Sequence, residues 1–348
     1  MKTEALVLLL GSLLLASLFV FRLQDVTRLG RCVAAFVAGL VIVQVVLGVV
    51  LSVFHLERQS YFLMVANAVK ARLEKTSAQP VFLVGASRTA RDVDGSLLER
   101  RMVEAGIHHP LVQLSYPGRY AFEQEFYLER LLKESGVKPK LMLIELGSDL
   151  RAALANVNRF KNEPIAFHDA PRVYEMLRIQ LGLGDYEGAL VSLRHMAAHY
   201  LNMGIARNLA REGSQVRLGF MPEEATPSAP SAERLAAELA QEGDTQRVEI
   251  AEVLLDFRRR QRARLERLGV EQVIYVHYPS AASNTRARLD VLCQRLQPCI
   301  SLNDPGLRRQ LNGPFWTDMG HLTAGGARIL TEAYAKILVP EIGRHDAR

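Results

Sequence analysis

Two long apolar runs dominate the beginning of the chain. The stretch from Ala5 to Phe21 consists almost wholly of Leu, Val, Ala and Phe, and the stretch from Cys32 to Phe54 carries no charged residue. A helix needs about 20 apolar residues to cross the hydrocarbon core of a bilayer. The pattern therefore predicts a two-helix membrane anchor within residues 1–55, with the lipid bilayer as a partner. A cleaved signal peptide is the alternative for the first run, which lacks a strongly basic start and a clear cleavage site.

The charges around these runs bear on the orientation of the anchor. The link at residues 22–31 carries three arginines and one aspartate, so the positive-inside rule keeps it in the cytoplasm and sends the following domain outward. Arg58 and Lys70, after the second run, favour the opposite orientation. Residues 56–79 are expected to form a juxtamembrane helix or linker. The apolar positions from Tyr61 to Leu73 fit a helix on the lipid headgroups and a helix packed on the domain equally well.

Beyond Pro80, short apolar runs alternate with helical stretches. The strand candidates are Val81–Val84, Leu111–Leu114, Leu141–Ile144, Gln272–Val276 and, more weakly, Cys299–Leu302. The expected crossover helices are Ser96–Ala105, Ala121–Ser135, Arg247–Leu268 and Ala324–Leu338. Strands that alternate with helices are typical of an α/β fold with a mainly parallel sheet covered on both faces. In such sheets the ligand site lies at the carboxyl ends of the strands.

One α/β domain is expected over residues 80–340, with an inserted region at about residues 150–246. No strand is predicted in the insertion. It contains helical stretches such as Val173 to Leu181 and Ala189 to Ala210, followed by a Pro/Ser/Ala-rich piece from Met221 to Ser231. An insertion of this kind covers an active site, binds a partner or decorates the fold, and the pattern does not choose between these roles.

Composition excludes some classes of protein. The chain has 348 residues, of which 49% are hydrophobic and 23% charged, so it is too apolar for a disordered protein. The formal net charge is +6, but the basic residues are scattered among acids and apolar positions instead of forming one patch. We therefore expect no nucleic-acid partner.

The cysteines and histidines do not form a metal-binding pattern. His195 and His199 have helical spacing, yet no glutamate lies between them and no third ligand is evident, so no metal site is predicted. Cys293 and Cys299 flank a short polar segment. They are candidates for a disulfide if the domain is extracytoplasmic, and the sequence leaves that pairing open.

A serine and a histidine stand where an α/β domain places chemistry. The first predicted strand runs into Gly85-Ala86-Ser87, which puts a serine at the carboxyl end of a strand that turns toward a helix. Near the end of the chain, Asp318 precedes His321 by three residues, directly before the last helix. This spacing lets the carboxylate hold one ring nitrogen while the other faces the serine hydroxyl. The pattern indicates Ser87 as nucleophile, His321 as base and Asp318 as its support.

The order of these blocks resembles the SGNH (GDSL-like) hydrolase family over about residues 81–338. The resemblance is carried by Gly-x-Ser after the first strand, a glycine at Gly118 after the second, and Asp-x-x-His before the final helix. It implies a three-layer α/β fold in which Ser87 attacks an acyl carbonyl, His321 is the general base and Asp318 supports it. It also implies an oxyanion-hole donor in the backbone N–H of Gly118, and it requires no cofactor.

The third block departs from the family pattern. The family usually has Gly-x-Asn-Asp after the third strand, whereas residues 145–149 read Glu-Leu-Gly-Ser-Asp, with no asparagine. Loss of one oxyanion donor typically costs on the order of 10²-fold or more in rate. Ser148 and Asp149 are the alternative candidates for adapting the site. Arg88, beside the nucleophile, is a candidate for holding an anionic or sugar group, and a solvent-exposed arginine is the equal alternative.

The membrane-anchored branch of that family offers the nearest resemblance. It implies an O-acyltransferase or esterase at the bacterial inner membrane, with its soluble domain facing the periplasm or exterior. The implied partners are a cell-envelope glycan substrate and, as a candidate, a membrane-bound O-acyltransferase. The rival hypothesis is a catalytically weak or inactive scaffold subunit of a polysaccharide modification or export complex. A simple lipase or thioesterase is a third class.

Overall fold

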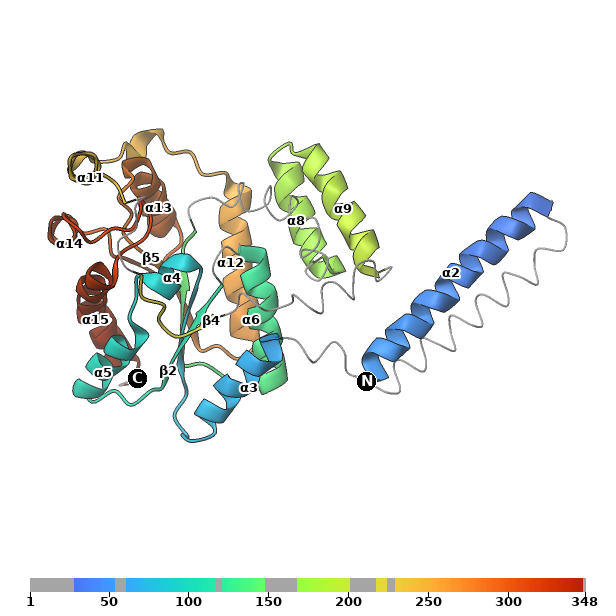
Figure 1. Ribbon diagram of the computed structural model, residues 1–348, viewed down its shortest axis with the longest axis horizontal. Helices are drawn as coiled ribbons and strands as arrows, with labels where there is room; N and C mark the ends of the chain where they lie inside the picture. The colour runs from blue at the N-terminus through green and yellow to red at the C-terminus, as the bar shows by residue number, and fades with distance from the viewer. Residues whose placement is uncertain are drawn as a thin grey trace.

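The computed structural model describes the greater part of the chain. The described residues are 28–53, 61–116, 121–147, 168–200, 217–223 and 229–346. Their centre is a six-stranded sheet in the order β4-β2-β1-β3-β5-β6 (Figure 1). Its strands are β1 (Val81–Gly85), β2 (Leu111–Ser115), β3 (Leu141–Glu145), β4 (Arg217–Leu218), β5 (Gln272–His277) and β6 (Cys299–Ser301).

Five of the six strands run parallel. β1 pairs with β2 and with β3, β3 pairs with β5, and β5 pairs with β6, each in parallel register. Every residue of β1, β2 and β3 is buried, because helices cover both faces of the sheet. The five strands expected from the sequence, and the α/β class with a mainly parallel sheet, are therefore confirmed.

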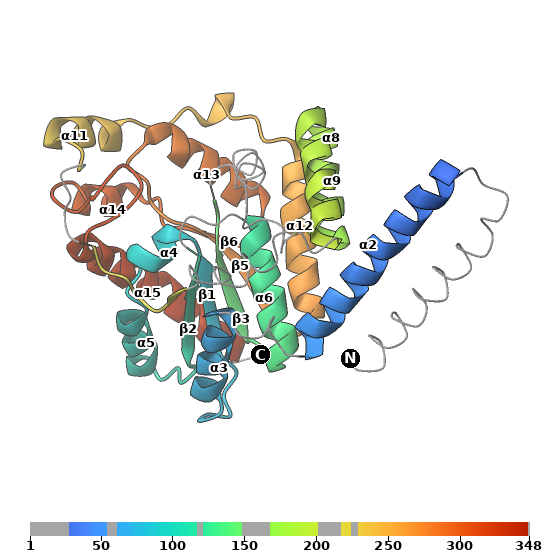
Figure 2. The same ribbon diagram turned by 45° about the vertical axis from the view of Figure 1, so that its right-hand side comes forward.

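Two helical layers enclose the sheet (Figures 1 and 2). One face is covered by α3 (Tyr61–Leu73), α6 (Ala121–Ser135), α12 (Glu252–Arg267) and α13 (Ser283–Arg295), whose apolar side chains share a core cluster with Phe82 and Val84. The other face is covered by α5 (Gly95–Glu104), α11 (Ala232–Ala240), α14 (Pro305–Gln310) and α15 (Ala324–Asp346), which share a cluster with Val81 and Leu83. Alternate residues of β1 thus point to opposite faces, as strand geometry requires.

The inserted region contributes a helical hairpin of α8 (Ala170–Gly182) and α9 (Tyr186–Tyr200). Met176 and Ile179 of α8 pack against Phe257 of α12 and Phe122 of α6 in a small separate cluster. The prediction of helices here is confirmed up to Tyr200, and residues 201–216 lie outside the described part.

The expectation that the insertion contains no strand was wrong. β4 pairs antiparallel with β2 through Leu218 opposite Leu114 and Arg217 opposite Ser115, and it forms one edge of the sheet. A two-residue strand has no room for the alternation of apolar and polar residues that would reveal it in the sequence.

The N-terminal region gives no support to the predicted anchor. The first apolar run lies outside the described residues, and the second falls on α2 (Arg28–Val53). Within the part of the chain that the structure describes, no helix is long and apolar enough to cross a membrane. The helix α3 packs on the domain, because Val65 and Val69 lie in the core.

Candidate active site

The nucleophile turn connects the end of β1 to the short helix α4 (Ser87–Arg91). Ser87 is the first residue of that helix, at the carboxyl edge of the parallel sheet. A Cβ atom at Gly85 would lie 1.9 Å from Thr89 Oγ1 and 2.4 Å from Glu145 Oε2. Both distances are far below van der Waals contact, so only glycine fits at this position of the Gly-x-Ser motif.

The base loop, residues 316–322, lies between α14 and α15 and folds around the carboxylate of Asp318. Asp318 Oδ1 accepts hydrogen bonds from the backbone N–H groups of Gly320 (2.6 Å) and His321 (2.9 Å). Trp316 and Leu322 form an isolated bridge that closes the loop. Trp316 is buried in the core, and its Nε1–H donates to the carbonyl of Leu311.

The tertiary structure brings the serine, histidine and aspartate into one chain of hydrogen bonds. His321 Nε2 lies 2.7 Å from Ser87 Oγ, and His321 Nδ1 lies 2.8 Å from Asp318 Oδ2. A carboxylate only accepts, so Nδ1 carries the ring proton and Nε2 accepts from the serine hydroxyl. Ser87 and His321 are 234 positions apart in the sequence, and the fold alone makes them neighbours.

The environment keeps Asp318 ionised. Partial burial raises the pKa of its carboxyl, but hydrogen bonds from the His321 ring and from the two loop N–H groups outweigh burial and hold that pKa below its ordinary value. An ionised aspartate in this place can fix the tautomer of the histidine, and it would stabilise an imidazolium if the serine gave up its proton.

Asp92 links the base loop to the nucleophile helix. It is the C-cap residue of α4, it is fully buried, and its Oδ1 accepts a hydrogen bond from the N–H of Leu322 (2.8 Å), the residue after His321. Burial raises the pKa of this carboxyl well above its ordinary value. One short helix thus carries the nucleophile at its first residue and restrains the base loop just beyond its last.

The remaining predicted site residues fare differently. Arg88 is buried; its Nε donates to Glu145 Oε1 (3.2 Å) and its guanidinium donates to the carbonyl of Leu146 (3.1 Å). The solvent-exposed alternative was wrong, because the side chain is buried, and a role of Arg88 in holding a substrate group stays a prediction. Gly118 and Ser148 lie outside the described residues, and their roles in an oxyanion hole stay predictions.

Glu145 was missed in reading the sequence for function. It ends β3 after four apolar residues, and its buried carboxylate contacts the nucleophile turn through Ala86, Arg88 and Thr89. A charged residue at the end of an otherwise apolar strand was the available signal. His277, at the end of β5, contacts the side chains of Asp290 and Ser301.

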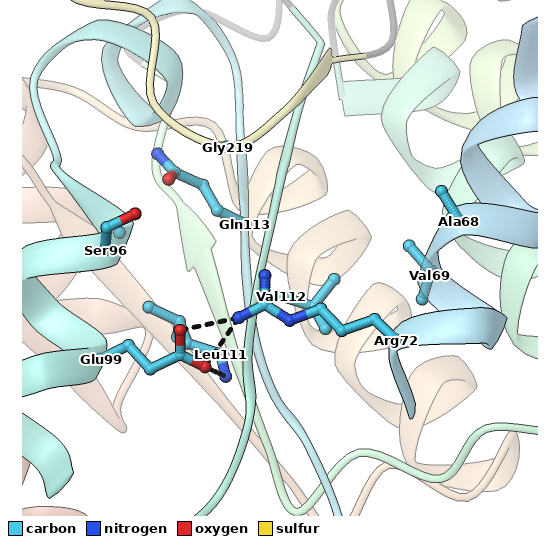
Figure 3. Close-up of a pocket in the computed structure, with 10 residues that line it drawn as sticks. Ala68, Val69, Arg72, Ser96, Glu99, Leu111, Val112, Gln113 and Gly219 are labelled. Atoms are coloured by element: carbon cyan, nitrogen blue, oxygen red, sulfur yellow. Dashed lines mark hydrogen bonds and ion pairs between the residues drawn. The ribbon is translucent and has the colours of Figure 1, made fainter. Parts of the chain in front are cut away.

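A cavity of about 90 Å³ lies apart from these residues, between α3, α5 and β2 (Figure 3). An ion pair between Arg72 and Glu99 (2.7 Å) crosses it, so its two charged groups satisfy each other. Gln113 lines it and turns its amide to the carbonyls of Thr89 and Val93. The cavity supplies no reactive group. Among the described residues, no group of three or more His, Cys, Asp or Glu side chains is arranged to hold a metal ion, and the absence of a metal stays a prediction.

Comparison with known proteins gives no match among protein-family models, curated proteins or solved structures.

Proposed function

We propose that the chain is a serine acyltransferase or esterase of SGNH type that acts on a cell-envelope polysaccharide. The observation that carries the proposal is the continuous hydrogen-bond chain from Ser87 through His321 to Asp318. Nucleophile and base lie within hydrogen-bond distance, and the base is oriented by a third group, which is the arrangement that activates a serine hydroxyl.

The chemistry follows from this geometry. His321 Nε2 takes the hydroxyl proton as Ser87 Oγ attacks the acyl carbonyl, and the protonated ring then gives that proton to the departing alcohol. The product is an acyl ester on Ser87. A sugar hydroxyl or water next attacks this ester, with His321 again as base, and the serine is regenerated. No cofactor takes part in either half of the reaction.

The oxyanion has one donor candidate within the described residues. Ser87 begins α4, so its N–H has no carbonyl four residues earlier in the helix and is available to a developing negative charge. The N–H of Gly118 is proposed as the second donor, on the resemblance alone.

A disulfide supports the proposed location outside the cytoplasm. Cys293 at the end of α13 and Cys299 at the start of β6 are bonded, with their Cα atoms 5.4 Å apart. Disulfides persist in the periplasm and other oxidising compartments and are rare in the cytoplasm. An envelope glycan as acyl acceptor, and a membrane-bound O-acyltransferase as the donor's source, rest on the resemblance to the membrane-anchored branch.

A non-catalytic scaffold is the second candidate. The absence of an asparagine in residues 145–149 favours it, because in the SGNH family that the chain resembles an asparagine completes the oxyanion hole. The hydrogen-bonded serine, histidine and aspartate favour the enzyme, since a scaffold has no need of them.

A fluorophosphonate probe separates the two candidates. It phosphonylates an activated serine, so the full-length wild-type chain is expected to become labelled and Ser87→Ala is expected to remain unlabelled. Ser96→Ala, which removes an exposed serine of α5, is the matched control and should label like the wild type. A wild-type chain that resists the probe while remaining folded favours the scaffold.

The acyl content of envelope polysaccharide provides the cellular test. Cells that carry Ser87→Ala at matched expression should differ from wild-type cells in that content. If only a full deletion has a phenotype, the protein acts as a scaffold. Rapid hydrolysis of short acyl esters without any glycan indicates the lipase or thioesterase class instead.

A further inference from the structure

Glu145 makes an unusual concentration of hydrogen bonds at the nucleophile turn. Its Oε2 atom accepts from the N–H of Ala86 (2.7 Å), the N–H of Thr89 (3.1 Å) and the hydroxyl of Thr89 (2.9 Å). Its Oε1 atom accepts from Arg88 Nε (3.2 Å). All four donors belong to residues close to Ser87 on either side, so the Glu145 carboxylate holds the backbone of the nucleophile turn in place.

These contacts replace the cap that the helix lacks. Ala86, the N-cap residue of α4, has no side chain able to accept the orphan N–H groups of the first turn. Glu145 reaches from a neighbouring strand and accepts two backbone donors at this helix start. Because its oxygens are occupied by protein donors, Glu145 is not free to act as a base on a substrate.

The charge of this carboxylate requires a partner. Glu145 is 5% exposed and Arg88 is 11% exposed, so water screens neither group well. An unpaired carboxylate beside Ser87 would repel the oxyanion that forms during acyl transfer. Arg88 supplies the opposite charge and is itself held by the carbonyl of Leu146. The pair is electrically neutral as a unit.

We infer that Glu145 and Arg88 are positioning residues for catalysis: a neutral buried clamp that sets the backbone of the nucleophile turn. The clamp aims Ser87 Oγ at His321 and keeps the N–H of Ser87 directed at the oxyanion. Arg88 prevents the anchoring carboxylate from opposing the reaction. The catalytic part of this inference rests on the proposed function, whereas the anchoring of the turn does not.

The first test separates reaction from binding. We would measure the fluorophosphonate labelling rate of the full chain against probe concentration for wild type and Glu145→Gln. The glutamine amide has one acceptor oxygen fewer, so either the backbone donors or Arg88 loses its acceptor. The maximal rate is expected to fall about 10²-fold, the cost of a misplaced reacting group, with the half-saturating concentration within about 3-fold of wild type. An unchanged maximal rate overturns the inference.

The second test asks whether the two residues act as a pair. Arg88→Met keeps the length of the side chain and removes the charge, and it should also slow labelling. Glu145→Gln with Arg88→Met should be no slower than Glu145→Gln alone, because Arg88 has no charge left to neutralise. If the double variant is slowed by the product of the two single-variant decreases in labelling rate, the two residues act independently and the pairing is refuted. Arg101→Met with Glu332→Gln removes an ion pair elsewhere on the domain and should leave the rate unchanged.

The third test does not depend on catalysis. Hydrogen–deuterium exchange of the peptide that contains residues 86–91 should be about 10-fold or more faster in Glu145→Gln, with exchange in β5 unchanged. Faster exchange without any labelling of the wild type would reject the proposed function but support the role of Glu145 in holding the nucleophile turn. Unchanged exchange would reject that role of Glu145. If Glu145→Gln fails to fold, Thr89→Val removes only the hydroxyl bond, and about 3-fold slower labelling is then expected.

Discussion

The two halves of the candidate site are held in contrasting ways. The base loop carries its own support, since Asp318 accepts from two N–H groups of the same loop and from the ring of His321. The nucleophile turn depends on a residue of another strand, because Glu145 is between 56 and 59 positions away from the donors of Ala86 and Thr89. The spacing of Asp318 and His321 can be recognised in the sequence because both residues lie in one loop. The contact of Glu145 with the nucleophile turn cannot be recognised, because it joins residues that are distant in the sequence.

Among the substitutions that test this comparison, removal of the histidine base should have the largest effect on the probe-labelling rate. In His321→Ala the Ser87 hydroxyl has no proton acceptor, so the probe-labelling rate is expected to fall on the order of 10⁵-fold. Stopped-flow or gel-based labelling with the folded state checked by circular dichroism measures it. His109→Ala, at the opposite end of the strands, serves as the control and should label normally. A loss of less than about 10-fold would refute a role for His321 as base.

Asp318→Asn tests the self-supporting half. The asparagine carbonyl still accepts from the loop N–H groups, but its NH₂ group cannot accept from His321 Nδ1–H, and the ring is free to take the wrong tautomer. The labelling rate should therefore fall about 10⁴-fold at neutral pH, far more than the modest loss of stability expected from removal of a carboxylate with a lowered pKa can explain. A large fall in melting temperature together with a normal rate per folded molecule would contradict this assignment.

Gly85→Ala tests the half that the fold assembles. The added methyl group would overlap Thr89 Oγ1 and the Glu145 carboxylate, so the turn must shift and the serine moves from its base. We expect labelling to slow about 10²-fold. Gly106→Ala disturbs a different turn of the domain and is the control for general destabilisation. Equal losses in both variants would show that the effect at Gly85 is not specific to the site.

Asp92→Asn tests the contact that joins the two halves, and its effect depends on pH. Burial raises the pKa of the wild-type carboxyl, so between its ordinary pKa and the raised value the group is protonated in the folded chain and ionises on unfolding. Its contribution to stability is complete below that ordinary pKa and is lost as pH rises toward the raised value. The asparagine lacks this loss, so the stability of the variant relative to wild type should increase with pH, by up to about 1.4 kcal/mol per pH unit.

Urea unfolding between pH 5 and pH 8 measures this trend. The opposite sign applies to Asp318, whose lowered pKa stabilises the fold above its ordinary pKa and is lost as pH falls through the lowered value. Asp318→Asn therefore supplies a contrast that appears only below the ordinary aspartate pKa of about 3.9, so a second unfolding series at about pH 3–4 is needed to see it. A relative stability of Asp92→Asn that does not change with pH would mean that Asp92 is ionised in the folded protein.

The fold was predictable to the extent that each element has its own pattern. The parallel strands are short apolar runs between turns, and the complete burial of β1, β2 and β3 makes each of these runs visible without long-range information. β4 was not predicted, because two residues are too few to show the alternation of a strand and because its pairing partner, β2, is distant in the sequence. The packing of α3 on the domain was one of two open alternatives, and the apolar contacts of Val65 and Val69 decided it.

For the site, the sequence by itself determined the chemical groups: a serine after a glycine at a strand end, and an aspartate three residues before a histidine. Their spacing suffices because each motif is local. Only the tertiary structure decided that Ser87 and His321 meet, that Arg88 faces inward, and that Glu145 and Asp92 anchor the two halves. The physical reason is that a buried charge or hydrogen-bond donor needs a partner, and the folded sheet determines which element supplies it. Because that element is distant in the sequence, the spacing of residues does not identify the partner.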